Sequence, residues 1–488
     1  MKKITLVLFS LVIGAFAFQS CEDQDDNAVP VSDFIWKGLN AYYLWQADVP
    51  NLADDRFSNQ EQLNKFLEAY SSPEELFESL RYQPGVIDRF SVIFPDFTVL
   101  ENLLAGVTKN NGMDYRLSYI NREDAGSTTA PIIGYVRYVM PGSDALNKGI
   151  RRGDIFTAVN GIPLTAANYT ELLGADTYTL TLATIENEVI TSDGREVALV
   201  KTEFAENPVN TVTTTTVGNH IIGYVMYTGF YGNYDTELNA AFGQLQSAGV
   251  TDIVLDLRYN GGGSVRTATY LGSMIAGEGH VGDLFAKQQW NAKLQAKYER
   301  ENPAALQNLF SATLSDNAPI NMLHNITKVY VLTSEETASA SELVINCLKP
   351  YVDVYQIGTK TVGKNVGSVT LYDSKDFSAR GRSGSHRYAM QPIVIRTINA
   401  EGFGEYSDGI TPDLILEERV STLGTLGDPS EPYFAAAIAQ ITANGRFSAH
   451  DNNDKFIPLE RKDVRRFKNE MYIETTPDGS GSLVKDLQ

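Results

Sequence analysis

The alternation of strand and helix patterns in the second half of the chain constrains its fold more than any other feature. Residues 328–333 are rich in β-branched side chains and predict a strand, and residues 340–349 place apolar side chains at helical spacing. Residues 352–357 then form a second strand pattern. Similar alternation extends over residues 206–440, so we expect a layered α/β core there.

Ser339 stands at the turn where the first of these strands gives way to the helix, within the sequence TASASE. The first turn of a helix leaves backbone N–H groups unpaired, and these donors and the helix dipole suit an oxyanion. Lys364 follows the second strand, so this unit could bring its amine to the Ser339 hydroxyl. Two ordinary alternatives stay open. Ser339 could be a helix N-cap with Glu342 closing a capping box, and Lys364 could be a solvated loop lysine.

Four segments, in order, resemble the C-terminal processing peptidases, the tail-specific serine–lysine proteases of bacteria and plastids. They are TASASE, VGKN around Lys364, DLRYNGGG at residues 256–263 and GITPD at residues 409–413. The resemblance runs from about residue 35 to residue 413 and points to a member of the type found among Bacteroidota lipoproteins. It implies a multidomain α/β protein with a crotonase- or ClpP-like catalytic core. The implied activity is that of a serine endopeptidase that cleaves proteins or peptides near their C-termini.

The same resemblance assigns roles to individual residues. Ser339 would be the nucleophile and Lys364 the general base. The oxyanion would be held by the N–H of Ala340 and by one from Gly262 or Gly263. Better-known members carry a glutamine four residues after the lysine, where this chain has Ser368, so Ser368 is the candidate for the third catalytic role. A free lysine has a pKa of about 10.4, so the site must lower that pKa by excluding water.

Two further parts precede the core. Residues 34–104 carry apolar side chains at helical spacing and predict an N-terminal helical domain, in which Ser72 is expected to cap a helix that starts at Pro73. Residues 105–205 form a β-rich module similar to a PDZ domain, a fold that captures peptides by strand addition. Its candidate peptide-binding loop consists of Gly112, Met113, Asp114 and Tyr115. The same residues could equally form an ordinary turn.

The N-terminal residues predict export. Residues 1–20 combine a basic start with an apolar run that is too short for a comfortable membrane span, which is typical of a signal peptide. Cys21 follows directly, as in a lipoprotein cleavage site, so we expect lipidation there and an acidic tether over residues 21–33. A plain secretory signal cleaved nearby is the alternative. We therefore expect an outer-membrane lipoprotein that faces the periplasm or the cell surface, with residues 441–488 as a C-terminal segment.

The composition argues against several functional classes. A net charge of −20 disfavours nucleic-acid binding, which depends on contacts with phosphates. Residues 358–365 nearly match a phosphate-binding P-loop, but Asn365 replaces the required hydroxyl and a strand pattern follows. The five histidines are scattered and no metal-binding motif is present, so we expect neither a metal nor another cofactor. Cys347 lies at an apolar helix position and is expected to be a buried small hydrophobe.

The expected partners are therefore protein or peptide substrates and, through a lipid anchor, a membrane. An alternative function stays open, in which an inactive peptidase scaffold acts as a surface lipoprotein that binds peptides or other ligands. Intact Ser339 and Lys364 favour catalysis, whereas Ser368 at the glutamine position keeps the binding protein open. Labelling of Ser339 by a fluorophosphonate would distinguish the two functions.

Overall fold

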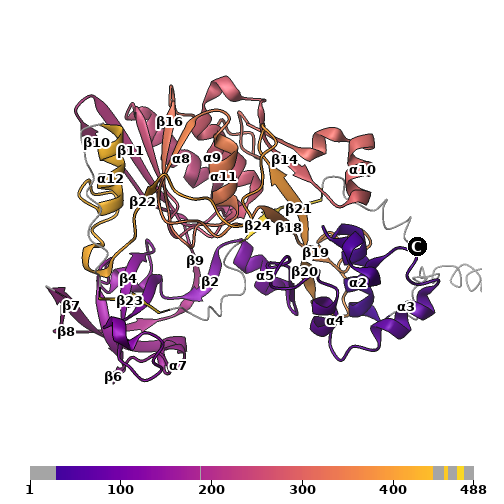
Figure 1. The fold of residues 1–488 in the computed structure, drawn as a ribbon, viewed down its shortest axis with the longest axis horizontal. Coiled ribbons are helices and arrows are strands. Elements are labelled where there is room, and N and C mark those ends of the chain that lie inside the picture. Colours follow the sequence, from indigo (N-terminus) through magenta and orange to yellow (C-terminus); the bar gives the residue numbers. More distant parts are fainter. Residues whose placement is uncertain (1–28, 187, 443–454, 460–469, 477–488) are drawn as a thin grey trace, which may run out of the picture.

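A computed structural model describes residues 29–186, 188–442, 455–459 and 470–476. The expected signal peptide, Cys21 and most of the acidic tether lie outside these residues. Figure 1 shows an α/β body with two smaller parts below it, a β-rich lobe at the left and a helical part at the right. The predicted α/β multidomain fold class is therefore confirmed. Among the helices so described, none has both the length and the apolar character needed to pass through a bilayer.

The body is built on a six-stranded sheet with the order β10-β11-β12-β16-β17-β22. Strands from β11 to β22 run parallel, and β10 pairs antiparallel with β11. The strands are β10 (Val209–Val217), β11 (His220–Tyr227), β12 (Asp252–Asp256), β16 (Lys328–Thr333), β17 (Asp353–Gly358) and β22 (Leu414–Ile415). The predicted strand–helix–strand unit around Ser339 is β16, α11 (Ala340–Leu348) and β17, which confirms that prediction.

Helices cover both faces of this sheet. One face packs on α12 (Pro432–Ile441), where the Phe434 and Tyr224 rings have centroids 4.9 Å apart. The opposite face packs on α8 (Asp235–Ser247), α9 (Val265–Ala276) and α11. Successive side chains of a strand point to opposite faces, which is why Tyr224 joins the α12 side and Val225 joins the other. Cys347 on α11 is fully buried, as predicted.

A second six-stranded sheet has the order β13-β24-β18-β21-β14-β15. Its strands are β13 (Gly263–Ser264), β24 (Met471–Ile473), β18 (Val366–Val369), β21 (Ile393–Ile398), β14 (Leu284–Gln289) and β15 (Gln307–Leu309). β24 comes from the C-terminal segment, yet it lies inside this sheet and runs parallel to β13 and β18. Figure 1 shows it next to β18. A part of the chain with no predicted structure therefore belongs to the body.

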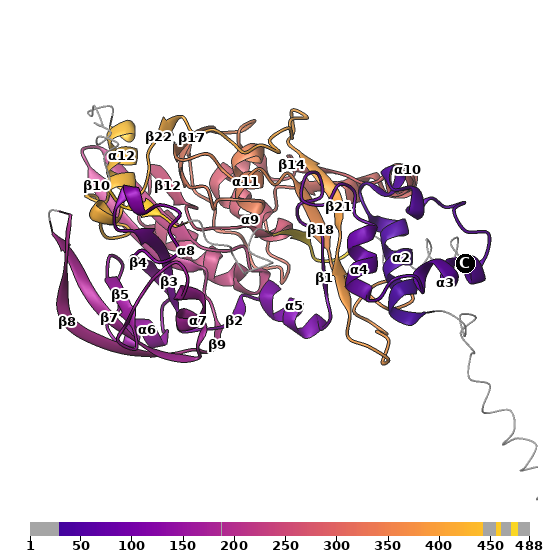
Figure 2. The same cartoon turned by 60° about the horizontal axis from the view of Figure 1, so that its bottom comes forward.

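The helical part lies at the opposite end of the molecule from the β-rich lobe (Figure 2). Its helices are α2 (Pro30–Tyr42), α3 (Gln60–Leu67), α4 (Pro73–Ser79) and α5 (Phe97–Leu104). Ser72 Oγ accepts the Glu75 N–H at 3.2 Å and caps α4, which confirms the predicted helix start. A short strand, β1 (Val92–Phe94), pairs with β20 (Ala389–Gln391), which also pairs with β19 (Leu371–Tyr372).

The β-rich lobe contains a sheet with the order β23-β3-β4-β5-β7-β8, and β6 pairs with β5. The strands are β3 (Met113–Tyr119), β4 (Ile132–Val139), β5 (Ile155–Val159), β6 (Ile162–Pro163), β7 (Thr177–Glu186), β8 (Val189–Val200) and β23 (Ile457–Pro458). The short helices are α6 (Asp144–Asn147) and α7 (Tyr169–Gly174). A separate pair, β2 (Val107–Asn110) and β9 (Thr202–Ala205), connects the lobe to the body. The C-terminal segment again contributes a strand, because β23 pairs with the edge of β3.

Ion pairs, one of them through the buried Arg137, attach the lobe to the body close to the nucleophile turn. Arg137 on β4 donates to Asp114 at 2.6 Å and to Glu336 at 2.8 Å. Arg116 on β3 forms an ion pair with Glu335. Glu335 and Glu336 precede Ser339 in the loop that leads into α11. The position of the lobe is therefore coupled to the loop that carries the nucleophile.

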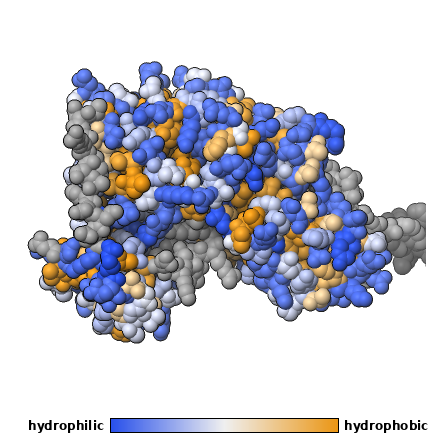
Figure 3. Space-filling model, viewed as in Figure 1, coloured by the Kyte–Doolittle hydropathy of each residue, from blue (hydrophilic) through white to orange (hydrophobic). Residues whose placement is uncertain are grey.

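The surface is dominated by polar side chains, with apolar residues in scattered patches on the face drawn in Figure 3. Large apolar side chains that stay exposed come from different parts of the molecule, for example Val86, Val189 and Ile415. Isolated exposed apolar residues are normal in folded proteins.

Candidate active site

Ser339 lies at the predicted turn, immediately before α11 begins at Ala340. Its backbone has φ 65° and ψ −116°, a conformation that costs a non-glycine residue on the order of 1–3 kcal/mol and that clusters at functional sites. The side chain is fully buried, and its hydroxyl oxygen has no hydrogen-bond partner among the described residues. The turn therefore has the capping-box arrangement of the alternative interpretation, with Glu342 accepting the Ser339 N–H, while the Ser339 hydroxyl itself stays without a hydrogen bond.

Glu342 holds the nucleophile turn and the lysine loop together. One of its carboxylate oxygens accepts the N–H of Ser339 at 2.7 Å and the N–H of Lys364 at 2.8 Å. The other oxygen accepts the N–H of Gly363 at 2.7 Å and the hydroxyl of Thr361. Burial raises the pKa of Glu342, although these hydrogen bonds act in the opposite direction. The two predicted catalytic residues are thus brought together through one buried carboxylate.

Asn260 fixes the glycine-rich loop against the nucleophile turn. Its backbone carbonyl accepts the N–H of Ala338 at 3.2 Å and the hydroxyl of Ser341 at 3.1 Å. Its side-chain oxygen accepts the N–H of Gly262 at 2.8 Å, and its amide donates to the Tyr227 carbonyl at 2.9 Å. The DLRYNGGG segment is therefore a rigidly bonded part of the site and not a mobile turn.

Gly262 packs closely against the nucleophile turn. It has φ 111°, and a Cβ on it would lie 2.6 Å from the Ser339 Cβ and 2.9 Å from the Ala340 nitrogen. Any side chain there would collide with the turn, and the positive φ also favours glycine. The Gly262 N–H already donates to Asn260, so Ala340 and Gly263 are the remaining candidates among the three predicted oxyanion donors.

Lys364 is fully buried beside several carboxylates. Its amine lies 3.0 Å from a carboxylate oxygen of Glu470 and 4.7 Å from the centre of the Phe90 ring. Burial lowers the pKa of Lys364, while Glu470, Asp88 and Glu342 act in the opposite direction without reversing it. Burial likewise raises the pKa of Glu470, and Lys364 opposes that shift. A lysine with a lowered pKa is what a general base at neutral pH requires.

Ser368 is buried on β18, and its hydroxyl donates to the carbonyl of Met471 at 3.2 Å. Ser368, the predicted third catalytic residue, therefore contacts β24. The Lys364 amine instead donates to Glu470, which lies in the same C-terminal segment. A catalytic role for Ser368 stays a prediction.

A cavity of about 590 Å³ connects the glycine loop with the β-rich lobe. At the catalytic end it is lined by Gly261, Gly262, Gly263 and Glu470. At the lobe it is lined by Met113, Asp114 and Tyr115, the first residues of β3. Tyrosine rings contribute much of the remaining wall: Tyr138, Tyr178, Tyr231, Tyr259 and Tyr472. The cavity therefore extends from the glycine loop and Glu470 to the predicted peptide-binding residues, while Ser339 and Lys364 are not among the residues that line it.

The predicted peptide-binding loop differs from the structure in one respect. Gly112 lies at the turn, but Met113 and the two residues after it belong to β3, where Met113 pairs with Val139. The N–H groups of Gly112 and Met113 already donate to the side chains of Asn110 and Asn111, at 2.7 and 3.2 Å. A peptide carboxylate would have to displace these side chains to use the same donors. The peptide-binding role stays a prediction.

Two features of the site escaped sequence reasoning. The sequence places Glu342 only within the alternative of a capping box, because nothing local indicates that it also reaches the Lys364 loop. Glu470 lies in a polar segment, and no local pattern marks it as a site residue. The short apolar run of Met471, Tyr472 and Ile473 was the available signal for a strand there.

Comparison with known families gives two matches along the chain. The family model described as "Peptidase family S41" matches residues 221–415, and the model described as "Peptidase S41 N-terminal domain" matches residues 31–92. The first range contains the nucleophile turn, the glycine loop and Lys364, and the second covers most of the helical part.

Known proteins are similar over most of the chain. The "C-terminal processing peptidase, chloroplastic" of Tetradesmus obliquus is 24% identical over 412 residues, which cover 80% of this chain and 80% of that protein. A "Probable CtpA-like serine protease" of Staphylococcus aureus strain N315 is 25% identical over 282 residues, 57% of this chain and 49% of that protein. A crystal structure of a "Putative S41 protease" from Bacteroides fragilis NCTC 9343 superposes with a TM-score of 0.67 and 26% identity. That match covers 84% of this chain and 97% of the other.

Proposed function

This chain belongs to peptidase family S41 and is a serine-type peptidase, and on that premise we propose that Ser339 and Lys364 carry out the cleavage as nucleophile and general base. The observation that carries the proposal is the buried carboxylate of Glu342, which accepts hydrogen bonds from the backbone N–H groups of both residues. The unpartnered Ser339 hydroxyl and the lowered pKa of Lys364 support the same assignment.

The proposed reaction is acyl transfer. The Ser339 oxygen attacks the carbonyl carbon of the scissile bond while its proton passes to the neutral amine of Lys364. The N–H groups of Ala340 and Gly263 hold the oxyanion of the tetrahedral intermediate. Cleavage of the C–N bond returns the proton from Lys364 to the leaving amine and leaves an ester on Ser339. Lys364 then takes a proton from water, the hydroxide hydrolyses the ester, and the proton returns to Ser339.

We further propose that substrates are proteins or peptides cut near their C-termini, and that they reach Ser339 along the cavity from β3. The aromatic walls of this cavity suit apolar side chains of an extended peptide. The edge of β3 offers backbone groups for strand addition, since the chain itself adds β23 there. A PDZ-like role of the β-rich lobe is part of this proposal.

The test uses the soluble chain that begins after Cys21, beside Ser339→Ala and Lys364→Ala. Each protein is incubated with unfolded proteins and with peptides that have apolar C-termini, and the products are identified by mass spectrometry. We expect cleavage by the parent and by neither variant, with products that define the preferred site. Lys360→Ala is the matched control, because Lys360 lies in the same loop but forms an exposed ion pair with Asp408. Equal cleavage by parent and Ser339→Ala would contradict the proposal.

The alternative function, a peptide-binding scaffold without activity, has no specific observation in its favour. Fluorophosphonate labelling separates the two directly, because an inactive scaffold would not label at Ser339 above the level of Ser339→Ala. Retained peptide binding without labelling or cleavage would favour the scaffold.

Location is also a proposal. We propose that Cys21 is lipidated and anchors the protein in the outer membrane. The full chain is expected in the membrane fraction, and Cys21→Ser is expected in the soluble fraction. An unchanged distribution of Cys21→Ser would contradict the anchor.

A further inference from the structure

The C-terminal strand β24 lies between the two loops that carry the proposed chemistry. It runs parallel to β13, which continues from the glycine loop, and Met471 is in register with Gly263. It also runs parallel to β18, which follows Lys364, and Tyr472 is in register with Ser368. An extended segment of the chain therefore fills the space between the oxyanion side and the lysine side of the site.

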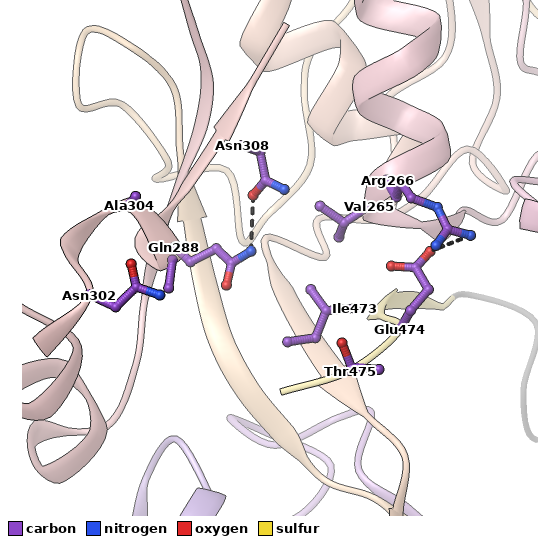
Figure 4. Close-up of a pocket in the computed structure, with 10 residues that line it drawn as sticks. Val265, Arg266, Gln288, Asn302, Ala304, Asn308, Ile473, Glu474 and Thr475 are labelled. Carbon is purple, nitrogen blue, oxygen red and sulfur yellow. Dashed lines mark hydrogen bonds and ion pairs between the residues drawn. The ribbon is translucent and has the colours of Figure 1, made fainter. Parts of the chain in front are cut away.

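The docked strand is held by contacts on both of its sides. Met471 is fully buried, and its carbonyl accepts the Ser368 hydroxyl at 3.2 Å. The Tyr472 hydroxyl donates to the carbonyl of Leu104 at 3.3 Å. Beyond the strand, Figure 4 shows Glu474 directed toward Arg266 at the start of α9, and the pair is 3.6 Å apart. These contacts fix the position and direction of the segment.

Glu470, which leads into the strand, meets both catalytic residues. Its backbone carbonyl oxygen lies 2.3 Å from the point that a Cβ on Gly262 would occupy, and the Ser339 Cβ lies 2.6 Å from the same point. The Glu470 carbonyl is therefore beside the nucleophile. Its carboxylate lies 3.0 Å from the Lys364 amine. One residue thus occupies the substrate side of Ser339 and also engages the base.

This arrangement does not suit catalysis. A general base must reach the Ser339 hydroxyl, but the Glu470 carboxylate lies 3.0 Å from the Lys364 amine and acts against the lowering of the Lys364 pKa by burial. The Lys364 amine donates to Glu470 at 3.0 Å, and the Ser339 hydroxyl has no hydrogen-bond partner within the described part of the chain. A peptide substrate would also need the space that Glu470 and Met471 fill.

We propose that residues 470–473 are a built-in inhibitory strand, which binds in the active site in place of an extended peptide and must leave before substrate can enter. The inference rests on the proposed serine–lysine chemistry, because inhibition presupposes that Ser339 and Lys364 are the reacting groups. The inhibitor is recognised by backbone pairing with β13 and β18 and by its acidic residue opposite Lys364. Other peptides with an acidic residue at that position would compete for the same space.

The first experiment measures the rate at which a fluorophosphonate labels Ser339 at pH 7. The proteins are the soluble parent, Glu470→Gln and Glu301→Gln, with folding checked by thermal unfolding. We expect Glu470→Gln to label at least about tenfold faster than the parent, because loss of the carboxylate frees the amine and weakens the docked strand. Glu301→Gln is the control, because it removes an exposed carboxylate that pairs with Arg300 and does not contact the strand, and we expect it to label like the parent. Equal or slower labelling of Glu470→Gln would overturn the inference and make Glu470 a supporting partner of the base.

The second experiment keeps Glu470 and locks the strand. Val369 and Ile473 are register partners on β18 and β24, so Val369→Cys with Ile473→Cys can form a reversible disulfide. The soluble chain retains one native cysteine, the buried Cys347. We expect the oxidised protein to cleave casein more slowly than the reduced protein. Equal rates would show that the strand need not leave, and would overturn the inference.

A third measurement adds the inhibitor in trans. A synthetic peptide with the sequence of residues 468–476 should slow labelling of Glu470→Gln, and the peptide with glutamine at position 470 should act more weakly. Absence of any effect at millimolar peptide, or cleavage of the Glu470–Met471 bond, would overturn the assignment, since an inhibitory strand must bind and must survive. If neither parent nor any variant labels or cleaves, the proposed function itself fails. If all label equally fast, the proposed function stands and this inference alone fails.

Discussion

The nucleophile side and the lysine side of the site are built in different ways. Ser339, its neighbour Ala340 and the carboxylate of Glu342 come from one turn at the start of α11. The Lys364 amine, by contrast, contacts Glu470, which is 106 residues further along the chain. The difference teaches that the nucleophile turn is built mainly from one stretch of chain, with Asn260 as its distant support, whereas the contact of the base depends on whether the C-terminal strand is docked.

Removing the carboxylate that joins the two sides should have the largest effect. In Glu342→Ala, three backbone N–H groups and the Thr361 hydroxyl lose a buried acceptor. We expect the free energy of unfolding to fall by about 3–5 kcal/mol and the cleavage rate to fall by about a hundredfold or more. Denaturant unfolding and cleavage rates measure both effects. Glu335→Ala, which removes an exposed carboxylate from the loop before α11, is the control, and an equal loss there would mean that the effect is not specific to the hydrogen bonds of Glu342.

A side chain at Gly262 should damage the nucleophile side selectively. In Gly262→Ala the new Cβ would lie within 3 Å of Ser339 and of the Glu470 carbonyl, and the φ of 111° disfavours alanine. We expect fluorophosphonate labelling to fall by about a hundredfold, because displacement of the turn would misplace the Ser339 hydroxyl and the Ala340 N–H. Gly279→Ala has open space around its Cβ and should label normally. Normal labelling of Gly262→Ala would contradict the close packing of Gly262 against the Ser339 turn.

The pH dependence of the cleavage rate should change when Glu470 is replaced. Activity requires neutral Lys364, so the rate should rise with pH as the ammonium loses its proton. The carboxylates of Glu470, Asp88 and Glu342 all raise the pKa of Lys364 against the larger effect of burial. In Glu470→Gln one of these charges is lost, so the rising limb of the pH–rate profile should move to lower pH. A shift to higher pH would contradict the ion pair as the cause.

A purely local contact, far from the site, should have the smallest effect. Ser72→Ala removes the cap of α4 and should lower the free energy of unfolding by about 1 kcal/mol. We expect the pH–rate profile to stay unchanged. Thermal unfolding and a pH profile together measure this. A changed profile would show that the helical part communicates with Lys364, which lies near Phe90 of that region.

Prediction from sequence succeeded where the determining contacts are local. The cap at Ser72, the strand–turn–helix unit around Ser339 and the burial of Cys347 all follow from periodicity and end signals. It was incomplete for Met113, whose position in β3 depends on pairing with Val139. Pairing partners are chosen by the whole sheet, which local patterns do not encode.

The sequence by itself determined that this chain forms a layered α/β body with a serine at a strand-to-helix turn, because side-chain periodicity and turn chemistry act over a few residues. Only the tertiary structure decided that Glu342 accepts hydrogen bonds from the Lys364 loop and that Asn260 accepts one from the Gly262 N–H. It also decided that β24 enters the site. Each of these depends on groups distant in sequence that meet only when the sheets assemble. A three-residue strand such as β24 is too short for its side-chain pattern to be recognised in the sequence, so its pairing partners are known only from the folded chain.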